Sequence, residues 1–138
     1  MNGEIVHHPT HVIDIMPTLL QVSGAKYPKR LDGRPIMPKQ GVCLIKTVKS
    51  RRGSRELFFE HEGNRAMRDD EWKLVALKGR PWELYNIEED RNELNNLAAE
   101  EKRRVRRMEK KWLEWAEENF VATEPIDLEV QYLKPPGN

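Results

Sequence analysis

The fold is decided by residues 57–98, which read LFFEHEGNRAMRDDEWKLVALKGRPWELYNIEEDRNELNNLA. The stretch contains short β-prone segments separated by turn residues, and several of them alternate between two faces. In the first segment this alternation places Leu57, Phe59 and His61 on one face. Short segments in direct succession predict an antiparallel meander. The predicted strands are residues 57–61, 65–68, 72–77 and 82–86.

The turns between these segments carry recognisable signals. Gly63-Asn64 and Asp69-Asp70 lie between the first three segments, and Lys78-Gly79-Arg80-Pro81 precedes the last. In residues 72–77 both alternating faces are fairly apolar, which is typical of a central strand. One face holds Trp72, Leu74 and Ala76, and the other holds Lys73, Val75 and Leu77.

The hydrophobic period becomes helical over residues 97–118. Val105, Met108, Trp112 and Trp115 recur at spacings of three, four and three, which places them on one stripe of a helix. We expect Asn95 or Asn96 to cap this helix, and Glu100-Glu101 to complement the dipole in its first turn. The sheet is the obvious apolar partner for the stripe.

The N-terminal part is organised differently. Residues 13–23 predict a short amphipathic helix with Ile15, Leu19 and Val22 near one face and Met16 and Leu20 beside it. Pro17 suits only the start of that helix, and Gly24 supplies a left-handed stop. Residues 25–55 read as a long, turn-rich connection.

Together these elements predict an α+β protein with a small antiparallel sheet of about four strands packed against a long C-terminal helix. The expected organisation is a joining segment, a compact domain and an extended, proline-containing tail. Their ranges are residues 1–54, 55–120 and 121–138.

Composition narrows the functional classes. The 138 residues suit one globular domain, and 24 Lys and Arg against 23 Asp and Glu create no overall field for nucleic acid or an anionic membrane. The single cysteine, Cys43, excludes an internal disulfide framework. No apolar run approaches the length of a membrane span, and residues 1–4 show no signal peptide.

Four motifs in order resemble the C-terminal subdomain of type I (formylglycine-dependent) sulfatases of the arylsulfatase type. They are Arg65-Ala66-Met67-Arg68, Trp72-Lys73-Leu74, Trp82-Glu83-Leu84-Tyr85-Asn86 and Glu93-Leu94-Asn95-Asn96-Leu97-Ala98. Upstream, residues 12–20 and 31–34 are similar to the segment that joins the large sulfatase domain to this subdomain. The sequence departs from the family pattern at Asp70-Glu71, where glycine is frequent, and at Asn86, where aspartate is common.

The resemblance implies a parent enzyme that hydrolyses sulfate esters, with a formylglycine nucleophile and a calcium ion in a large domain. It implies two partners, which are that large domain and a sulfated substrate, either an aryl sulfate or a sulfated sugar. It also implies a periplasmic or extracellular parent. No nucleic acid and no membrane are expected as partners.

The catalytic parts of that family are not expected in this chain. The nucleophile arises within Cys/Ser-x-Pro-x-Arg, whereas Cys43 is followed by Leu44-Ile45-Lys46-Thr47. Ser23, Ser50 and Ser54 fail the same motif, and Asp69-Asp70 reads as a turn, not as a calcium ligand pair. We therefore expect no catalytic residue, no metal site and no turnover by this chain alone.

Two histidine-containing groups remain as candidates. His7, His8 and His11 could bind zinc, but Pro9 prevents the helix that would align them, so a linker or contact role is favoured. By resemblance, the hairpin with His61, Asn64 and Arg65 faces the substrate cleft in some sulfatases, where an arginine fork would suit a sulfate or carboxylate. A purely structural role for these three residues is the alternative.

Two surfaces complete the predictions. Seven Lys and Arg residues between positions 102 and 111 crowd one helix, and interleaved glutamates favour a solvated face over a binding stripe. A stand-alone interaction module that uses this basic helix is the alternative function. The second surface is the apolar helix around Ile15, Met16, Leu19 and Leu20, which could drive self-association if left uncovered.

Overall fold

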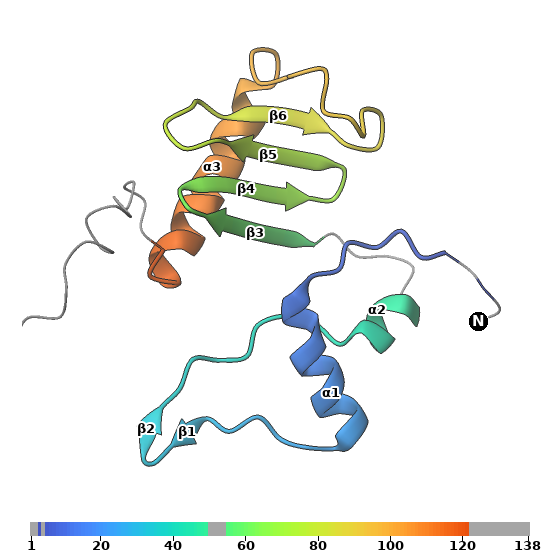
Figure 1. The fold of residues 1–138 in the computed structure, drawn as a ribbon, viewed down its shortest axis with the longest axis vertical. Coiled ribbons are helices and arrows are strands. Elements are labelled where there is room, and N and C mark those ends of the chain that lie inside the picture. Colours follow the sequence, from blue (N-terminus) through green and yellow to red (C-terminus); the bar gives the residue numbers. More distant parts are fainter. Residues whose placement is uncertain (1–2, 4, 50–54, 122–138) are drawn as a thin grey trace, which may run out of the picture. The chain divides into compact units, whose positions relative to one another are not determined.

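The computed structural model describes residues 3, 5–49 and 55–121 (Figure 1). The chain divides into two compact units, an N-terminal unit of residues 1–54 and a C-terminal unit of residues 55–138. Each unit is described by itself below. Of the predicted tail, residues 122–138 lie outside the described residues.

The C-terminal unit contains a four-stranded antiparallel sheet in the order β3-β4-β5-β6, so every strand pairs with its neighbour in sequence. This confirms the predicted meander. The tight turns need left-handed backbone, which Glu62, Gly63 and Asp70 provide with φ values of 54°, 85° and 51°. The strands are Glu56–His61, Asn64–Asp69, Trp72–Ala76 and Glu83–Asn86.

The register of the sheet lines up one apolar row across all four strands. Phe58 pairs with Met67, Met67 with Leu74, and Leu74 with Leu84, and strand alternation puts these side chains on one face. Helix α3, Lys102–Glu118, lies across that face (Figure 1). The predicted α+β architecture is therefore confirmed.

Helix α3 fills the core with the stripe that the sequence predicted. Met108 and Trp112 are fully buried, and Trp115 stacks on Phe58 with ring centroids 5.4 Å apart. Ala116 is also fully buried and extends the stripe by one position. The core cluster comprises Met67, Leu74, Leu84, Met108, Trp112 and Ala116.

The predicted start of this helix at residue 97 is wrong, because α3 begins at Lys102. Asn96 does not cap it. Its side-chain oxygen accepts hydrogen bonds from the backbone N–H groups of Leu84 (3.1 Å) and Ala98 (3.0 Å). Asn96 thereby ties the preceding loop to β6, and the residue at the cap position, Glu101, makes no side-chain capping bond.

Two arginine–tryptophan stacks lie beside the core cluster, against which both tryptophans pack. The Arg104 guanidinium lies 3.9 Å from the ring centroid of Trp72, and the Arg65 guanidinium lies 4.4 Å from that of Trp82. Trp72 begins β5, whereas Arg65 pairs with Ala76 at the end of β5, so the stacks lie at opposite ends of this strand.

The N-terminal unit begins with a 3-10 turn, Val12–Asp14, that continues into α1, Ile15–Ser23. Pro17 lies in the first turn of α1 and Gly24 ends the helix in the left-handed conformation (φ 71°), as predicted. The region from residue 25 was expected to be only a connection and is more ordered than that. It contains a small hairpin, β1 (Arg30–Leu31) with β2 (Arg34–Pro35), and a short helix, α2 (Leu44–Lys49).

Across the described ranges 3, 5–49 and 55–121, no helix combines the length and the apolar character that crossing a bilayer requires.

Candidate functional site

Asp14 organises the N-terminal unit. Its side chain is fully buried, and its carboxylate accepts hydrogen bonds from the backbone N–H groups of His11 (2.8 Å) and Val42 (2.9 Å). The His11 side chain also contributes to this turn, because its Nδ1 accepts a hydrogen bond from the Ile13 N–H at 3.3 Å. The carboxylate thus joins the start of α1 to a loop 28 residues away in sequence.

Thr18 and Gly41 reinforce the same connection. The Thr18 hydroxyl donates to the Asp14 carbonyl (2.6 Å) and accepts from the Leu44 N–H (2.9 Å). Gly41 has φ +83°, and a Cβ there would lie 2.3 Å from the Ile13 carbonyl oxygen. Only glycine allows the loop to approach this closely.

The outer face of this unit is apolar and open. Helical spacing places five large apolar side chains along one stripe from the 3-10 turn to the end of α1, and all are between 51% and 70% exposed. Single exposed apolar residues are ordinary, but a continuous stripe marks a contact surface. Leu20, which was predicted to join this patch, is partly buried. The apolar stripe consists of Val12, Ile15, Met16, Leu19 and Val22.

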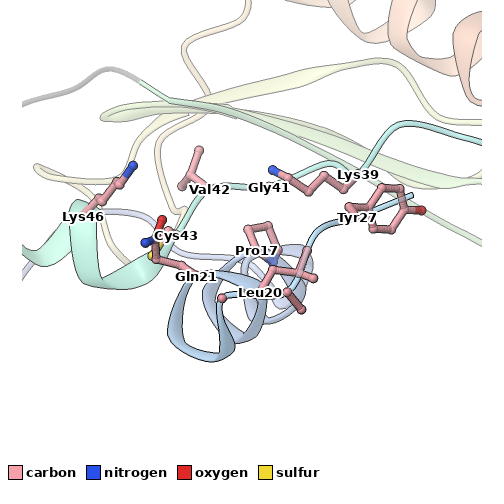
Figure 2. A pocket seen from close by; sticks show the side chains of 11 residues that line it. Pro17, Leu20, Gln21, Tyr27, Lys39, Gly41, Val42, Cys43 and Lys46 are labelled. Atoms are coloured by element: carbon pink, nitrogen blue, oxygen red, sulfur yellow. The ribbon is translucent and has the colours of Figure 1, made fainter. Parts of the chain in front are cut away.

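A hollow of about 550 Å³ lies between α1, the loop before α2 and the start of α2 (Figure 2). Leu20, Tyr27 and Cys43 line it, with Lys39 and Lys46. The backbone N–H of Lys46 lowers the pKa of Cys43 below its ordinary value, and the Ile45 N–H and the Thr18 hydroxyl act in the same direction.

The predicted substrate group lies on one hairpin but on two faces. His61 ends β3 and pairs with Asn64, which begins β4, and the Asn64 Nδ2 donates to the His61 carbonyl at 3.0 Å. His61 is exposed. Arg65 follows Asn64 along β4, so its side chain emerges on the opposite face, the one that α3 covers.

Arg65 is held by stacking, not by an ion pair. Its guanidinium lies over Trp82 and 5.9 Å from the Trp112 centroid, and its Nε is buried without a hydrogen-bond partner among the described residues. Trp82 is itself fixed, since its Nε1–H donates to Glu109 at 2.9 Å. Arg65 thus lies over an indole with its Nε donor left over, and the guanidinium fork is the geometry that matches a sulfate or carboxylate.

Asp69 and Asp70, the pair that the sequence assigned to a turn, have partners within the subdomain. Asp69 pairs with Arg107 at 3.8 Å, and Asp70 accepts the Arg55 backbone N–H at 3.2 Å. Within the described residues no group of three or more His, Cys, Asp or Glu side chains is placed to hold a metal ion, and those include His7, His8 and His11. The expectation that the calcium ion and the formylglycine belong to another domain stays a prediction.

The face of the sheet away from α3 carries Tyr85, a residue whose pKa is shifted. The Tyr85 hydroxyl donates to Glu83 at 2.8 Å, and this carboxylate, together with burial, raises the pKa of Tyr85 to about 12. The neighbouring Lys73 pairs with Glu93 at 2.5 Å. No sequence motif pointed to either pair, because both depend on strand register and on the loop after β6.

Comparison with known proteins identifies the type of domain. The family model for the C-terminal domain of N-sulphoglucosamine sulphohydrolase matches residues 2–118. The chain is 29% identical over 125 residues to an uncharacterized sulfatase of Schizosaccharomyces pombe, which covers 84% of this chain and 23% of that protein. It is 24% identical over 120 residues to arylsulfatase K of Xenopus laevis, covering 79% of this chain and 22% of that protein. The chain therefore spans less than a quarter of the length of these relatives.

Solved structures agree on the fold. The crystal structure of Ps i-CgsB matches with a TM-score of 0.69 at 20% identity, covering 91% of this chain and 28% of that one. The structure of BT4656 in complex with its substrate D-glucosamine-2-N,6-O-disulfate matches with a TM-score of 0.58 at 18% identity, covering 83% and 25%. At these identities the likeness establishes the fold alone. The family match over residues 2–118 establishes more: this chain belongs to the N-sulphoglucosamine sulphohydrolase C-terminal family and is a C-terminal sulfatase subdomain.

Proposed function

We propose that this subdomain supports the large catalytic domain of a sulfuric ester hydrolase and completes its substrate pocket, without turning over substrate alone. The observation that carries the proposal is the apolar stripe. Its five side chains are more than half exposed, although Asp14 and Thr18 hold the helix in place from its other side. A helix fixed by buried hydrogen bonds and left apolar on its outer face is suited to dock against another domain.

The occupant proposed for the stripe is the large domain of the same protein. The longer relatives support this, since each contains about three quarters of its length outside the matched region. The formylglycine and calcium would reside in that domain and supply the nucleophile and the electrostatic stabilisation of the sulfate oxygens. The parent would then be a periplasmic or extracellular enzyme.

The hairpin at β3 and β4 is the proposed contribution to the substrate pocket. His61 is exposed at the hairpin end, Asn64 fixes the turn, and the Nε of Arg65 has no hydrogen-bond partner among the described residues. The relative with structure BT4656 has D-glucosamine-2-N,6-O-disulfate as its substrate. A sulfated sugar is accordingly the proposed substrate class here, with Arg65 as the group that would meet an anionic substituent.

The test compares this chain with the full gene product on an aryl sulfate and on sulfated sugars. We expect turnover only from the full product. Leu19→Asp should weaken its activity and thermal stability, since it places a charge in the apolar stripe, whereas Gln21→Asp adds the same charge on the other side of α1. Turnover by this chain alone, or equal effects of both variants, would contradict the proposal.

The substrate role of the hairpin has its own test in the full product. His61→Ala and Arg65→Lys should raise KM for a sulfated sugar, while Glu62→Ala, at the neighbouring turn, should not. Arg65→Lys keeps the charge but loses the planar fork. If Arg65→Lys lowers the melting temperature and leaves KM unchanged, Arg65 is structural only.

A further inference from the structure

The exposed side of α3 changes sign along its length. Lys102, Arg103, Arg106, Arg107 and Lys110 are all exposed, and at 3.6 residues per turn they fall within an arc of about 140° over a length of about 12 Å. We call these five residues the basic ridge. Glutamates follow on the same side over the last turns of the helix, at positions 114, 117 and 118.

Helix stability does not account for this arrangement. The positive end of a helix dipole is its N-terminus, where acidic residues are favourable and basic ones are not. The first turn of α3 has no acidic residue and the last turn has no basic one, so the charges run opposite to the favourable order. Glu100 and Glu101 directly precede the helix, but the ion pair that Glu101 makes is with Arg104 at 3.5 Å and not with a residue of the ridge.

Three cations of the ridge make no ion pair with the described residues. Arg107 lies 3.8 Å from Asp69, and Lys110 lies 3.7 Å from Glu114. Lys102, Arg103 and Arg106 have no carboxylate within ion-pair distance among the described residues. This contrasts with the inner side of the helix, where Lys111 pairs with Glu56 and Arg104 stacks on Trp72.

The part of the sequence that carries the ridge is acidic in composition. Residues 55–138 contain 15 Lys and Arg against 20 Asp and Glu, which gives this unit a net charge of −5 with histidine neutral. A cluster of unpaired cations on an acidic unit produces a local field and no general attraction for polyanions. The site suits a flexible polyanion that carries several negative groups within a short length.

We propose that the basic ridge is a binding site for a sulfated polysaccharide, separate from the substrate hairpin. The choice of a sulfated glycan rests on the proposed function, and two observations favour it over nucleic acid. The tryptophans of α3 are packed inward, so no aromatic ring on the ridge can stack on bases. The acidic remainder of the unit would also repel a long duplex that runs past the ridge.

The test measures heparin binding by the 138-residue chain at low salt, using isothermal titration calorimetry. The ridge variant carries Lys102→Gln, Arg103→Gln and Arg106→Gln. The control variant carries Lys29→Gln, Arg30→Gln and Arg34→Gln, which removes three exposed cations from the N-terminal unit. Glutamine keeps helix propensity, and fewer cations at this terminus should not lower the melting temperature of the ridge variant.

We expect the chain to bind heparin and not desulfated heparin. The ridge variant should bind at least about ten-fold more weakly and with a shallower salt dependence, because fewer counterions are released. The control variant should change affinity by less than about three-fold. Equal losses in both variants, or no heparin binding at all, would overturn the proposal.

A duplex DNA oligonucleotide is the third probe. Binding to DNA as tight as to heparin, and lost in the ridge variant, would reassign the ridge to nucleic acid and overturn the glycan proposal. Because all readouts are affinities of this chain, they do not depend on turnover. The ridge and the proposed function can therefore fail separately.

Discussion

Replacing Asp14 by alanine should unfold the N-terminal unit and leave the C-terminal unit folded. The substitution removes the shared acceptor of two part-buried backbone donors, the N–H groups of His11 and Val42. Each buried donor left without a partner costs about 1–3 kcal/mol, so the loss is about 2–6 kcal/mol. A unit of 54 residues is stabilised by only about 3–8 kcal/mol in total. The substitution removes most of that.

The assay can separate the two units, because all four tryptophans lie in the C-terminal unit. Hydrogen exchange of the α1 amides reports the N-terminal unit, and tryptophan fluorescence in urea reports the other. Asp14→Ala should remove protection from α1 and leave the fluorescence transition in place. Asp14→Asn, which keeps one acceptor oxygen, should fall between, and Asp32→Asn at an exposed turn should have no effect. Unchanged α1 protection in Asp14→Ala would refute the reasoning.

Three further predictions concern single groups. Trp112→Ala should lower the free energy of unfolding, measured in urea, by about 3–5 kcal/mol. Leu113→Ala, at the next and exposed position, should lower it by under about 1 kcal/mol. Similar losses in both variants would show that Trp112 is not part of the core. In the folded protein, the alkylation rate of Cys43 should reach half its maximum at a pH below the ordinary thiol pKa. In urea, this midpoint should return to the ordinary value. The same midpoint in the folded and the unfolded protein would contradict the lowered pKa. The folded state holds the Tyr85 proton more tightly than the unfolded state does. The stability that this proton contributes should therefore be complete below pH about 10 and be lost as the pH rises to about 12. Glu83→Gln should shift the absorbance titration of Tyr85 downward, and an unshifted curve would exclude Glu83 as the cause.

The sheet could be predicted because its information is local. Alternation over residues 57–61 and 72–77 and the turn residues between the strands are readable one segment at a time. The stripe of α3 was equally visible, since Met108 and Trp112 follow helical spacing. The start of α3 was misplaced because Asn96 resembles a cap, whereas its oxygen bonds to β6, which is distant in sequence.

The N-terminal unit shows the opposite case. Its packing depends on Asp14 meeting Val42 and on Gly41 fitting against Ile13, and neither partner can be read from a window of sequence. The sequence could not show that the predicted substrate residues lie on opposite faces of the sheet, for the same reason. Asn64 and Arg65 are adjacent in sequence, and only the position of α3 shows which of them points toward the core.

The sequential strand order of the sheet has a consequence for how fast this unit folds. Each strand contacts the strand just before it in the chain, so most loops that must close are short hairpins. Low contact order of this kind is associated with folding in milliseconds or faster. The helix that covers the apolar row follows the last strand directly in the element order, so the unit completes its core without distant parts of the polypeptide.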